Sequence, residues 1–283
     1  MKHLKALLSI VVALTFMLIP IGTTTKTDAA TKNIYVHFIN VGQGDSIYIK
    51  APNGEDILID GGNKDGSDVV AYLKKQKVKD IEFMIATHPD ADHIGGLDEV
   101  LKAFPVKNVY APKVSHTSQA YKDFLTAVKN KKLTIKTAKA DVTLSIKGVT
   151  AKFVGPVKAY STSDTNDWSA VLKITYGKNS FLFTGDAETK AETDMIKAKK
   201  DLRADVLKVG HHGAKTSTST AFLNAVKPKY AVISVGKNSY GHPTKEVLNR
   251  LKAAKVTVYR TDQKGTIVFT SNGSTLSVKT ERR

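Results

Sequence analysis

The hydrophobic pattern of the chain alternates between two types along its length. Short apolar or alternating runs, typical of strands, lie at 34–39, 46–50, 56–59 and 82–86. Helical spacing of apolar residues appears at 69–75, 97–104 and 121–130. Strand-like runs return at 143–146, 150–154, 170–176 and 180–184.

The last third of the chain repeats this alternation in shorter steps. We expect helices at 187–199, 219–226 and 244–254, and strands at 205–209, 230–235, 256–259, 266–269 and 276–278. Strands therefore come first and helices follow, twice over. Two sheets packed face to face with helices on both outer faces satisfy this order, so we expect an α/β fold, a four-layer αββα sandwich.

The first 30 residues are typical of a secretory signal peptide. Lys2 and Lys5 give a basic start, an apolar stretch covers 7–21, and Ala29 and Ala30 are small residues suited to cleavage. The alternative is a permanent anchor, but the apolar stretch is short for a span of about 20 residues. We expect one domain over 31–283, secreted or associated with the cell envelope, with no stable membrane span after signal removal.

Composition limits the chemistry and indicates a partner class. The chain has no cysteine, which excludes disulfides and thiolate ligands. Its net charge is +17, and +15 without the three lysines and one aspartate of residues 1–30. Such a surplus favours a polyanion, either nucleic acid or an anionic cell-wall polymer. The lysines are scattered, which also fits ordinary solvated helix faces.

The loop after the 82–86 run contains four side chains able to bind a metal. His88, Asp90, Asp92 and His93 lie within six residues and are followed by two glycines. Imidazoles and carboxylates together hold hard or borderline divalent cations. The alternative interpretation is an ordinary exposed polar loop. Matching residues further along the chain favour the metal-binding interpretation.

Three later apolar runs also end in polar clusters. Asp186 follows 180–184, His211 and His212 follow 205–209, and His242 comes after 230–235. Loops at strand ends are where α/β proteins place their ligands and chemistry. Five of the eight histidines in the chain lie in these clusters or in the first loop.

These motifs together resemble the metallo-β-lactamase fold superfamily, and within it the extracytoplasmic hydrolase domain of the ComEC-type DNA-uptake proteins and their secreted relatives. The matching stretches span nearly all of 31–283 and are at 38–45, 58–62, 87–96, 183–188, 209–213, 240–243 and 261–265. The resemblance implies an αββα sandwich with two divalent metal ions at one edge. Asp90 stands where the superfamily has a second histidine, and the 163–170 segment has no further histidine. These changes make the site richer in oxygen ligands. Manganese is therefore a candidate metal as well as zinc, and magnesium is a further candidate.

The resemblance also implies roles for the site residues. His88 and Asp90 are expected to hold one metal, Asp92, His93 and His242 the other, and Asp186 to bridge them. Water activated by the metals is the expected nucleophile. Asp92, His211 and His212 are the expected catalytic residues, with a histidine as general acid or phosphate ligand. Asp60 and Asp45 are candidates for orienting the ligands, with turn stabilisation as the alternative for each. Candidates for substrate contact are Asn166, Ser169 and Trp168, although a packed loop anchor is the commoner role of a tryptophan.

A metal pair and a basic chain favour hydrolysis of a phosphodiester polymer. Because the resemblance points to DNA uptake, nucleic acid is the first expected substrate. The alternatives are a cell-envelope phosphodiesterase of the teichoic acid or phosphocholine type, and a non-catalytic polyanion-binding module.

Overall fold

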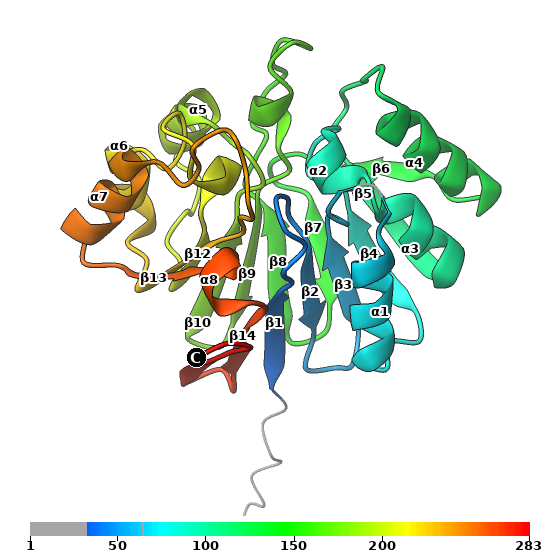
Figure 1. Cartoon of the computed structure of the whole chain (residues 1–283), viewed down its shortest axis with the longest axis horizontal. Helices are drawn as coiled ribbons and strands as arrows, with labels where there is room; N and C mark the ends of the chain where they lie inside the picture. Colours follow the sequence, from blue (N-terminus) through cyan, green and yellow to red (C-terminus); the bar gives the residue numbers. More distant parts are fainter. Residues whose placement is uncertain (1–32, 64) are drawn as a thin grey trace, which may run out of the picture. The chain divides into compact units, whose positions relative to one another are not determined.

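The computed structural model describes residues 33–63 and 65–283, in which two β-sheets pack face to face between helices (Figure 1). The expected signal peptide at 1–30 lies outside the described residues. Within the described part of the chain, no helix is long and apolar enough to cross a membrane. The predicted fold class, a four-layer αββα sandwich, is confirmed.

The first sheet has eight strands, antiparallel from β15 to β3 and parallel from β3 to β6. In spatial order these are β15 (Leu276–Thr280), β14 (Ile267–Ser271), β1 (Ile34–Phe38), β2 (Ile47–Lys50), β3 (Asp56–Ile59), β4 (Ile81–Ile85), β5 (Val106–Ala111) and β6 (Ile135–Thr137).

The second sheet has seven strands, parallel from β13 to β10 and antiparallel from β10 to β7. In spatial order these are β13 (Thr257–Arg260), β12 (Tyr230–Ile233), β11 (Val206–Lys208), β10 (Asn179–Phe183), β9 (Leu172–Tyr176), β8 (Val149–Phe153) and β7 (Thr143–Ile146). Each sheet therefore has a parallel half whose strands point their carboxyl ends the same way.

Aromatic and branched side chains fill the space between the sheets. The ring of Phe38 on β1 lies 6.1 Å from that of Phe183 on β10, and 6.1 Å from that of Phe269 on β14. All three are almost fully buried, and full burial of one such side chain contributes about 1.5–3 kcal/mol. This core joins the two sheets into one unit.

Helices cover the outer face of each sheet (Figure 1). Those on the first sheet are α1 (Ser67–Lys75), α2 (Ala91–Ile94), α3 (Leu97–Ala103) and α4 (Gln119–Asn130). Those on the second are α5 (Thr189–Lys197), α6 (Thr220–Val226) and α7 (Lys245–Ala253), while α8 (Thr261–Lys264) follows β13. Two 3₁₀ turns complete the set, η1 (Thr165–Trp168) and η2 (Gly210–Gly213).

Hydroxyl side chains fix where three of these helices begin. Ser118, Ser219 and Thr244 each accept a hydrogen bond from a backbone N–H in the first turn of α4, α6 and α7. Such caps satisfy donors that a helix start otherwise leaves free. The expected starts of these helices were therefore close to those found.

The sequence pattern does not predict β5 or β6. In β5 the apolar positions Val106, Val109 and Tyr110 follow Pro105 closely and resemble the end of the preceding helix. β6 has only three residues, two of them exposed, so it carries no apolar run to detect. In the structure β5 pairs in parallel with β4 and with β6, so both strands are defined by their neighbours in the sheet.

Candidate metal centre

The candidate site gathers loops from the carboxyl ends of parallel strands in both sheets. Asp60 follows β3 and the 87–93 segment follows β4, while Asp186 follows β10 and the two adjacent histidines of η2 follow β11. Loops at this end of parallel strands are the usual ligand positions in α/β folds. Segments more than a hundred residues apart in the sequence thus meet at one edge of the sandwich.

The loop after β4 places two imidazoles against each other. His88 and His93 are buried, and their ring centroids lie 4.2 Å apart. Asp90 Oδ2 is 3.7 Å from His88 Nε2. The α2 helix carries Asp92 and His93 as neighbours, and their ligand atoms lie within 4.8 Å of each other.

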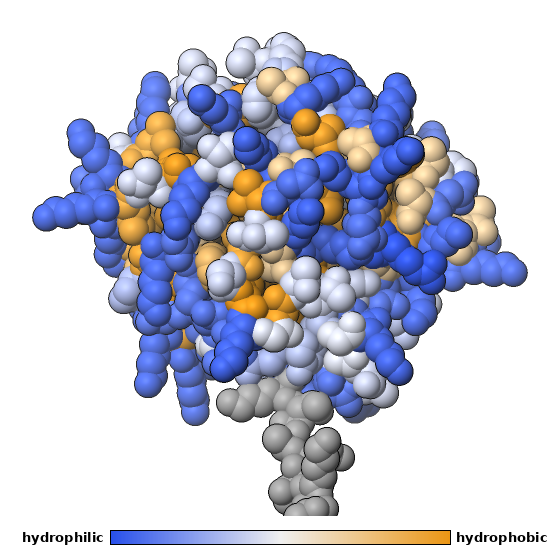
Figure 2. All heavy atoms as spheres, turned by 180° about the vertical axis from the view of Figure 1, so that it is seen from behind, coloured by the Kyte–Doolittle hydropathy of each residue, from blue (hydrophilic) through white to orange (hydrophobic). Residues whose placement is uncertain are grey.

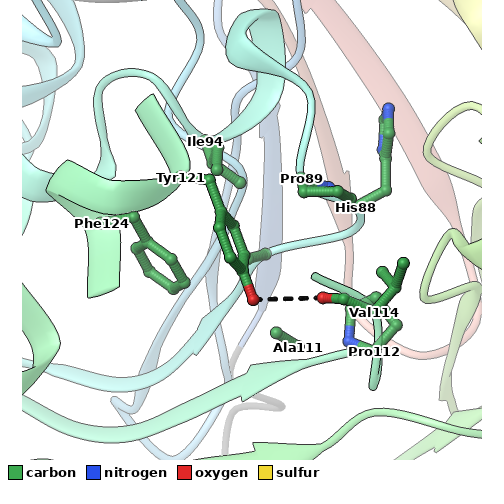
Figure 3. A pocket seen from close by; sticks show the side chains of 9 residues that line it. His88, Pro89, Ile94, Ala111, Pro112, Val114, Tyr121 and Phe124 are labelled. Carbon is green, nitrogen blue, oxygen red and sulfur yellow. Dashed lines mark hydrogen bonds between the residues drawn. The ribbon is translucent and has the colours of Figure 1, made fainter. Parts of the chain in front are cut away.

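His88 and Pro89 also form one wall of an apolar hollow (Figure 3). Val114, Tyr121 and Phe124 line the rest of it, and the Tyr121 hydroxyl donates to the Val114 carbonyl at 3.2 Å. The His88 imidazole points away from these apolar side chains (Figure 3), and His88 is only 1% exposed. Interactions of that ring with charges are stronger in such low-dielectric surroundings.

Asp60 lies directly behind the His93 imidazole. Its Oδ2 lies 2.8 Å from His93 Nδ1, and its two oxygens accept hydrogen bonds from the Thr87 backbone N–H at 2.8 Å and hydroxyl at 2.6 Å. Asp60 is fully buried. A carboxylate behind one ring nitrogen fixes the tautomer and presents the other nitrogen to a metal.

Asp186 lies at the centre of the imidazoles. Its Oδ1 is 3.2 Å from His93 Nε2, and its Oδ2 is 3.4 Å from His212 Nε2 and 3.8 Å from His211 Nε2. Its backbone N–H donates to Ser169 Oγ at 3.0 Å. Ser169 is 1% exposed, so it anchors the backbone of Asp186 instead of facing a substrate.

The two adjacent histidines of η2 point to different partners because both adopt a left-handed backbone, with φ of 47° at His211 and 50° at His212. Such non-glycine residues cost about 1–3 kcal/mol each and cluster at functional sites. His212 Nδ1 donates to the Ser234 carbonyl at 2.8 Å, and its Nε2 is 3.1 Å from Asp92 Oδ2. His211 Nδ1 is 2.8 Å from Glu188 Oε1.

The structure does not bring His242 into the group of ligand atoms. Its ring centroid lies 5.4 Å from that of His211, and it is His212 that meets Asp92 and Asp186. Within the described residues, four groups of potential ligands have their atoms within 4.8 Å of one another, and two of these groups combine two imidazoles with one carboxylate. These two groups are His88, His93 and Asp186, and Asp92, His93 and His212.

A buried ion pair lies directly behind these imidazoles. Lys208 Nζ is 2.8 Å from Asp45 Oδ2, and both side chains are almost fully buried. The carboxylate of Asp45 is also 3.5 Å from His212 Nδ1 and 3.9 Å from His93 Nδ1. Sequence reasoning missed Lys208, although a lysine inside an apolar strand such as β11 signals a buried charge that needs a partner.

The 163–170 segment contributes less to the pocket than expected. Trp168 is 8% exposed, its indole N–H donates to the Ser161 carbonyl at 3.0 Å, and its ring packs on that of Tyr160. It is therefore not placed to stack on a base, and it has the packed position that was the alternative. Asn166 Nδ2 lies 3.4 Å from His211 Nδ1, at the edge of the site.

The buried carboxylates and imidazoles of the pocket shift one another's pKa values. Burial raises the pKa of Asp186, but His212 and His93 outweigh it and hold that pKa well below its usual range. Burial lowers the pKa of His93, but Asp186 and Asp60 hold it well above its usual range. The pKa of His88 is lowered, by burial and by His93. Without a metal, protons on imidazoles must therefore balance the buried carboxylates.

The residues present fit divalent metal ions. His88 Nε2, His93 Nε2 and Asp186 Oδ1 are buried and make no hydrogen bond. Buried polar atoms are normally paired, so three unpaired ligand-type atoms around one point indicate a missing partner. Nitrogen and carboxylate oxygen together suit zinc or manganese.

The fold and this site define a metal-dependent hydrolase class. The sequence profile of the Metallo-beta-lactamase superfamily matches residues 39–237, and the chain belongs to that superfamily. The solved metallo-beta-lactamase fold protein YhfI from Bacillus subtilis has the same fold, with a TM-score of 0.58 at 13% identity over 84% of this chain and 100% of that one.

More specifically, the chain resembles competence proteins. It is 34% identical over 253 residues to ComE operon protein 3 of Bacillus subtilis (strain 168), covering 83% of this chain and 32% of that protein. It is 33% identical over 234 residues to competence protein ComA of Neisseria gonorrhoeae, covering 81% of this chain and 31% of that protein. The expected resemblance to ComEC-type proteins is confirmed, and the chain spans about a third of the length of these relatives.

The Asp45–Lys208 pair gives a stability prediction. Lys208→Met leaves the Asp45 carboxylate buried without its cation, so we expect a loss of about 3–5 kcal/mol in the free energy of unfolding. Adding Asp45→Asn removes the unpaired charge and should recover part of that loss. Urea unfolding of the metal-free single and double variants measures both effects.

The control is Lys229→Met, which breaks the exposed pair with Asp205 and should cost at most about 1 kcal/mol. Strictly additive losses for Asp45→Asn and Lys208→Met would contradict the assignment of the pair as one unit.

Proposed function

We propose that this protein is a secreted or envelope-associated hydrolase that uses two divalent metal ions to cleave phosphodiester bonds in nucleic acid. The observation that carries the proposal is the cluster of imidazoles around Asp186, whose Oδ1 lies 3.2 Å from His93 Nε2 and whose Oδ2 lies 3.4 Å from His212 Nε2. Two-metal sites of this kind suit in-line displacement at phosphorus. The name of one relative, competence protein ComA, and the resemblance to ComEC-type DNA-uptake proteins support DNA as the polymer.

In this proposal, His88, Asp90 and Asp186 hold one ion. Asp92, His93, His212 and Asp186 hold the other, so His212 takes the position that the sequence assigned to His242. The first set is rich in oxygen, which favours manganese or magnesium there, and the second also suits zinc. Bound ions would lower the pKa of water and offset the charge on the phosphate oxygens.

The remaining residues position groups and move a proton. Glu188 Oε1 accepts from the Thr216 hydroxyl at 2.7 Å and lies 2.8 Å from His211 Nδ1. The other nitrogen of His211, Nε2, faces the central Asp186, and its side chain is 25% exposed. We assign His211 as the general acid that gives its Nε2 proton to the leaving oxygen. Asn166, close to the same ring, then contacts the substrate phosphate.

A comparison of two ligand variants tests the metal assignment. Asp186 serves both ions, whereas Asp90 is 33% exposed and serves one. Residues that only orient a metal ligand cost about 10–100-fold when mutated, so Asp186→Asn should lower activity by more than about 100-fold. Asp90→Asn should retain clearly more activity than Asp186→Asn. In a calorimetric metal titration, Asp90→Asn should abolish only one of the two binding steps. Equal losses in folded variants would argue against a shared carboxylate.

The substrate is tested by a hydrolysis screen with Mn²⁺, Zn²⁺ or Mg²⁺ against DNA, RNA, teichoic acid and a small chromogenic phosphodiester. A long strand engages many lysines, so kcat/KM for single-stranded DNA should fall with salt, with a log–log slope of about −0.7 per phosphate contact. The small diester should lose little. Hydrophilic side chains are spread widely over one face (Figure 2), and the lysines are scattered along the sequence, so several dispersed contacts are expected.

Cleavage of teichoic acid without cleavage of nucleic acid would replace the nuclease assignment with a cell-envelope phosphodiesterase. Binding of polyanions without hydrolysis under any metal would leave a binding module.

A further inference from the structure

Tyr240 has an unusual position for a large aromatic side chain. It is 73% exposed, compared with 39% for Tyr35 and 37% for Leu125, which are the other exposed large apolar residues of the described chain. A single exposed aromatic residue needs no explanation by itself. Tyr240 is notable because of the loop that carries it and the rings it joins.

The loop between β12 and α7 is closed by one side chain. Asn238 Nδ2 donates to the carbonyls of Gly236 and His242, both at 2.9 Å, and its Oδ1 accepts from the His242 N–H at 3.0 Å. Three bonds from one residue hold the loop across its neck. Tyr240 is therefore presented on a preformed support, and little ordering entropy opposes a ligand that binds to it.

A row of rings leads from Tyr240 to the metal pocket. Its ring lies 5.7 Å from that of His242 at an interplanar angle of 29°, and the ring of His242 lies 5.4 Å from that of His211. His211 Nε2 is in turn 3.8 Å from Asp186 Oδ2. The exposed phenol thus stands at the rim of the site, with the His242 ring between it and the proposed general acid.

We propose that Tyr240, supported by His242, is a stacking platform for a nucleobase next to the scissile phosphate. Aromatic side chains bind single-stranded nucleic acid in this way with little sequence preference, because every base offers a π-face. Exposed Lys237 and Lys245 flank the loop in sequence and supply charge for the neighbouring phosphates. This inference rests on the proposed function and narrows the substrate to single strands with bases, which excludes phosphodiesters that lack an aromatic group.

The test compares a labelled single-stranded oligonucleotide with an abasic strand of the same length and charge. Affinity is measured by fluorescence anisotropy with the full protein in chelator, where turnover does not interfere, and KM is measured with Mn²⁺. Tyr240→Ala should weaken binding of the base-containing strand by about 5- to 150-fold and leave the abasic strand unchanged. Tyr240→Phe keeps the ring and should bind like the wild type.

Leu125→Ala is the matched control, since it removes another exposed apolar side chain, on α4. The Leu125→Ala variant should bind the base-containing strand and the abasic strand with the affinities of the wild type. Equal affinities of the wild type for the two strands, or an unchanged Tyr240→Ala variant, would overturn the platform. Absence of hydrolysis for every strand would instead count against the proposed function, and the anisotropy result would still decide the role of Tyr240.

Discussion

The buried carboxylates at the edge of the sandwich are the constraint on which the site depends. Asp45, Asp60 and Asp186 are each at most 3% exposed, and Lys208 is the buried cation placed among them. Moving a charge out of water costs several kcal/mol unless it is paired. Protonated imidazoles would compensate these carboxylates in part, and divalent ions bound to the same atoms would do so more strongly. The need for compensating charge is thus built into the folded state.

This concentration of charge follows from the topology. The parallel half of each sheet ends at the same edge, so ligands arrive from strands that pair only within their own sheet. Close backbone approach also fixes two loops of the first sheet against each other, the β1–β2 loop and the α2 segment. The Asp45 N–H donates to the Asp92 carbonyl at 3.1 Å, and a Cβ on Gly44, which has φ of 142°, would lie only 2.4 Å from that oxygen. Glycine is required there because a side chain would push the α2 loop off Asp45.

Local sequence was enough to predict the layers and most of the residues that meet at the site. Apolar strands ending in His and Asp clusters are a local signal, and strand polarity brings the clusters together. The approach of His212 to Asp92 and Asp186 was not predictable, because it depends on the left-handed backbone at His211 and His212. The role of Lys208 was also hidden, since its partner Asp45 lies 163 residues earlier in the sequence.

The central claim is that the pocket around Asp186 holds two ions and that His212 completes the second one. Anomalous diffraction from crystals of the Mn²⁺-loaded protein tests this claim most directly. The account predicts two peaks about 3.5–4 Å apart, with Asp186 touching both and His212 ligating the second. A single peak, no peak, or a second ion ligated by His242 in place of His212 would contradict it.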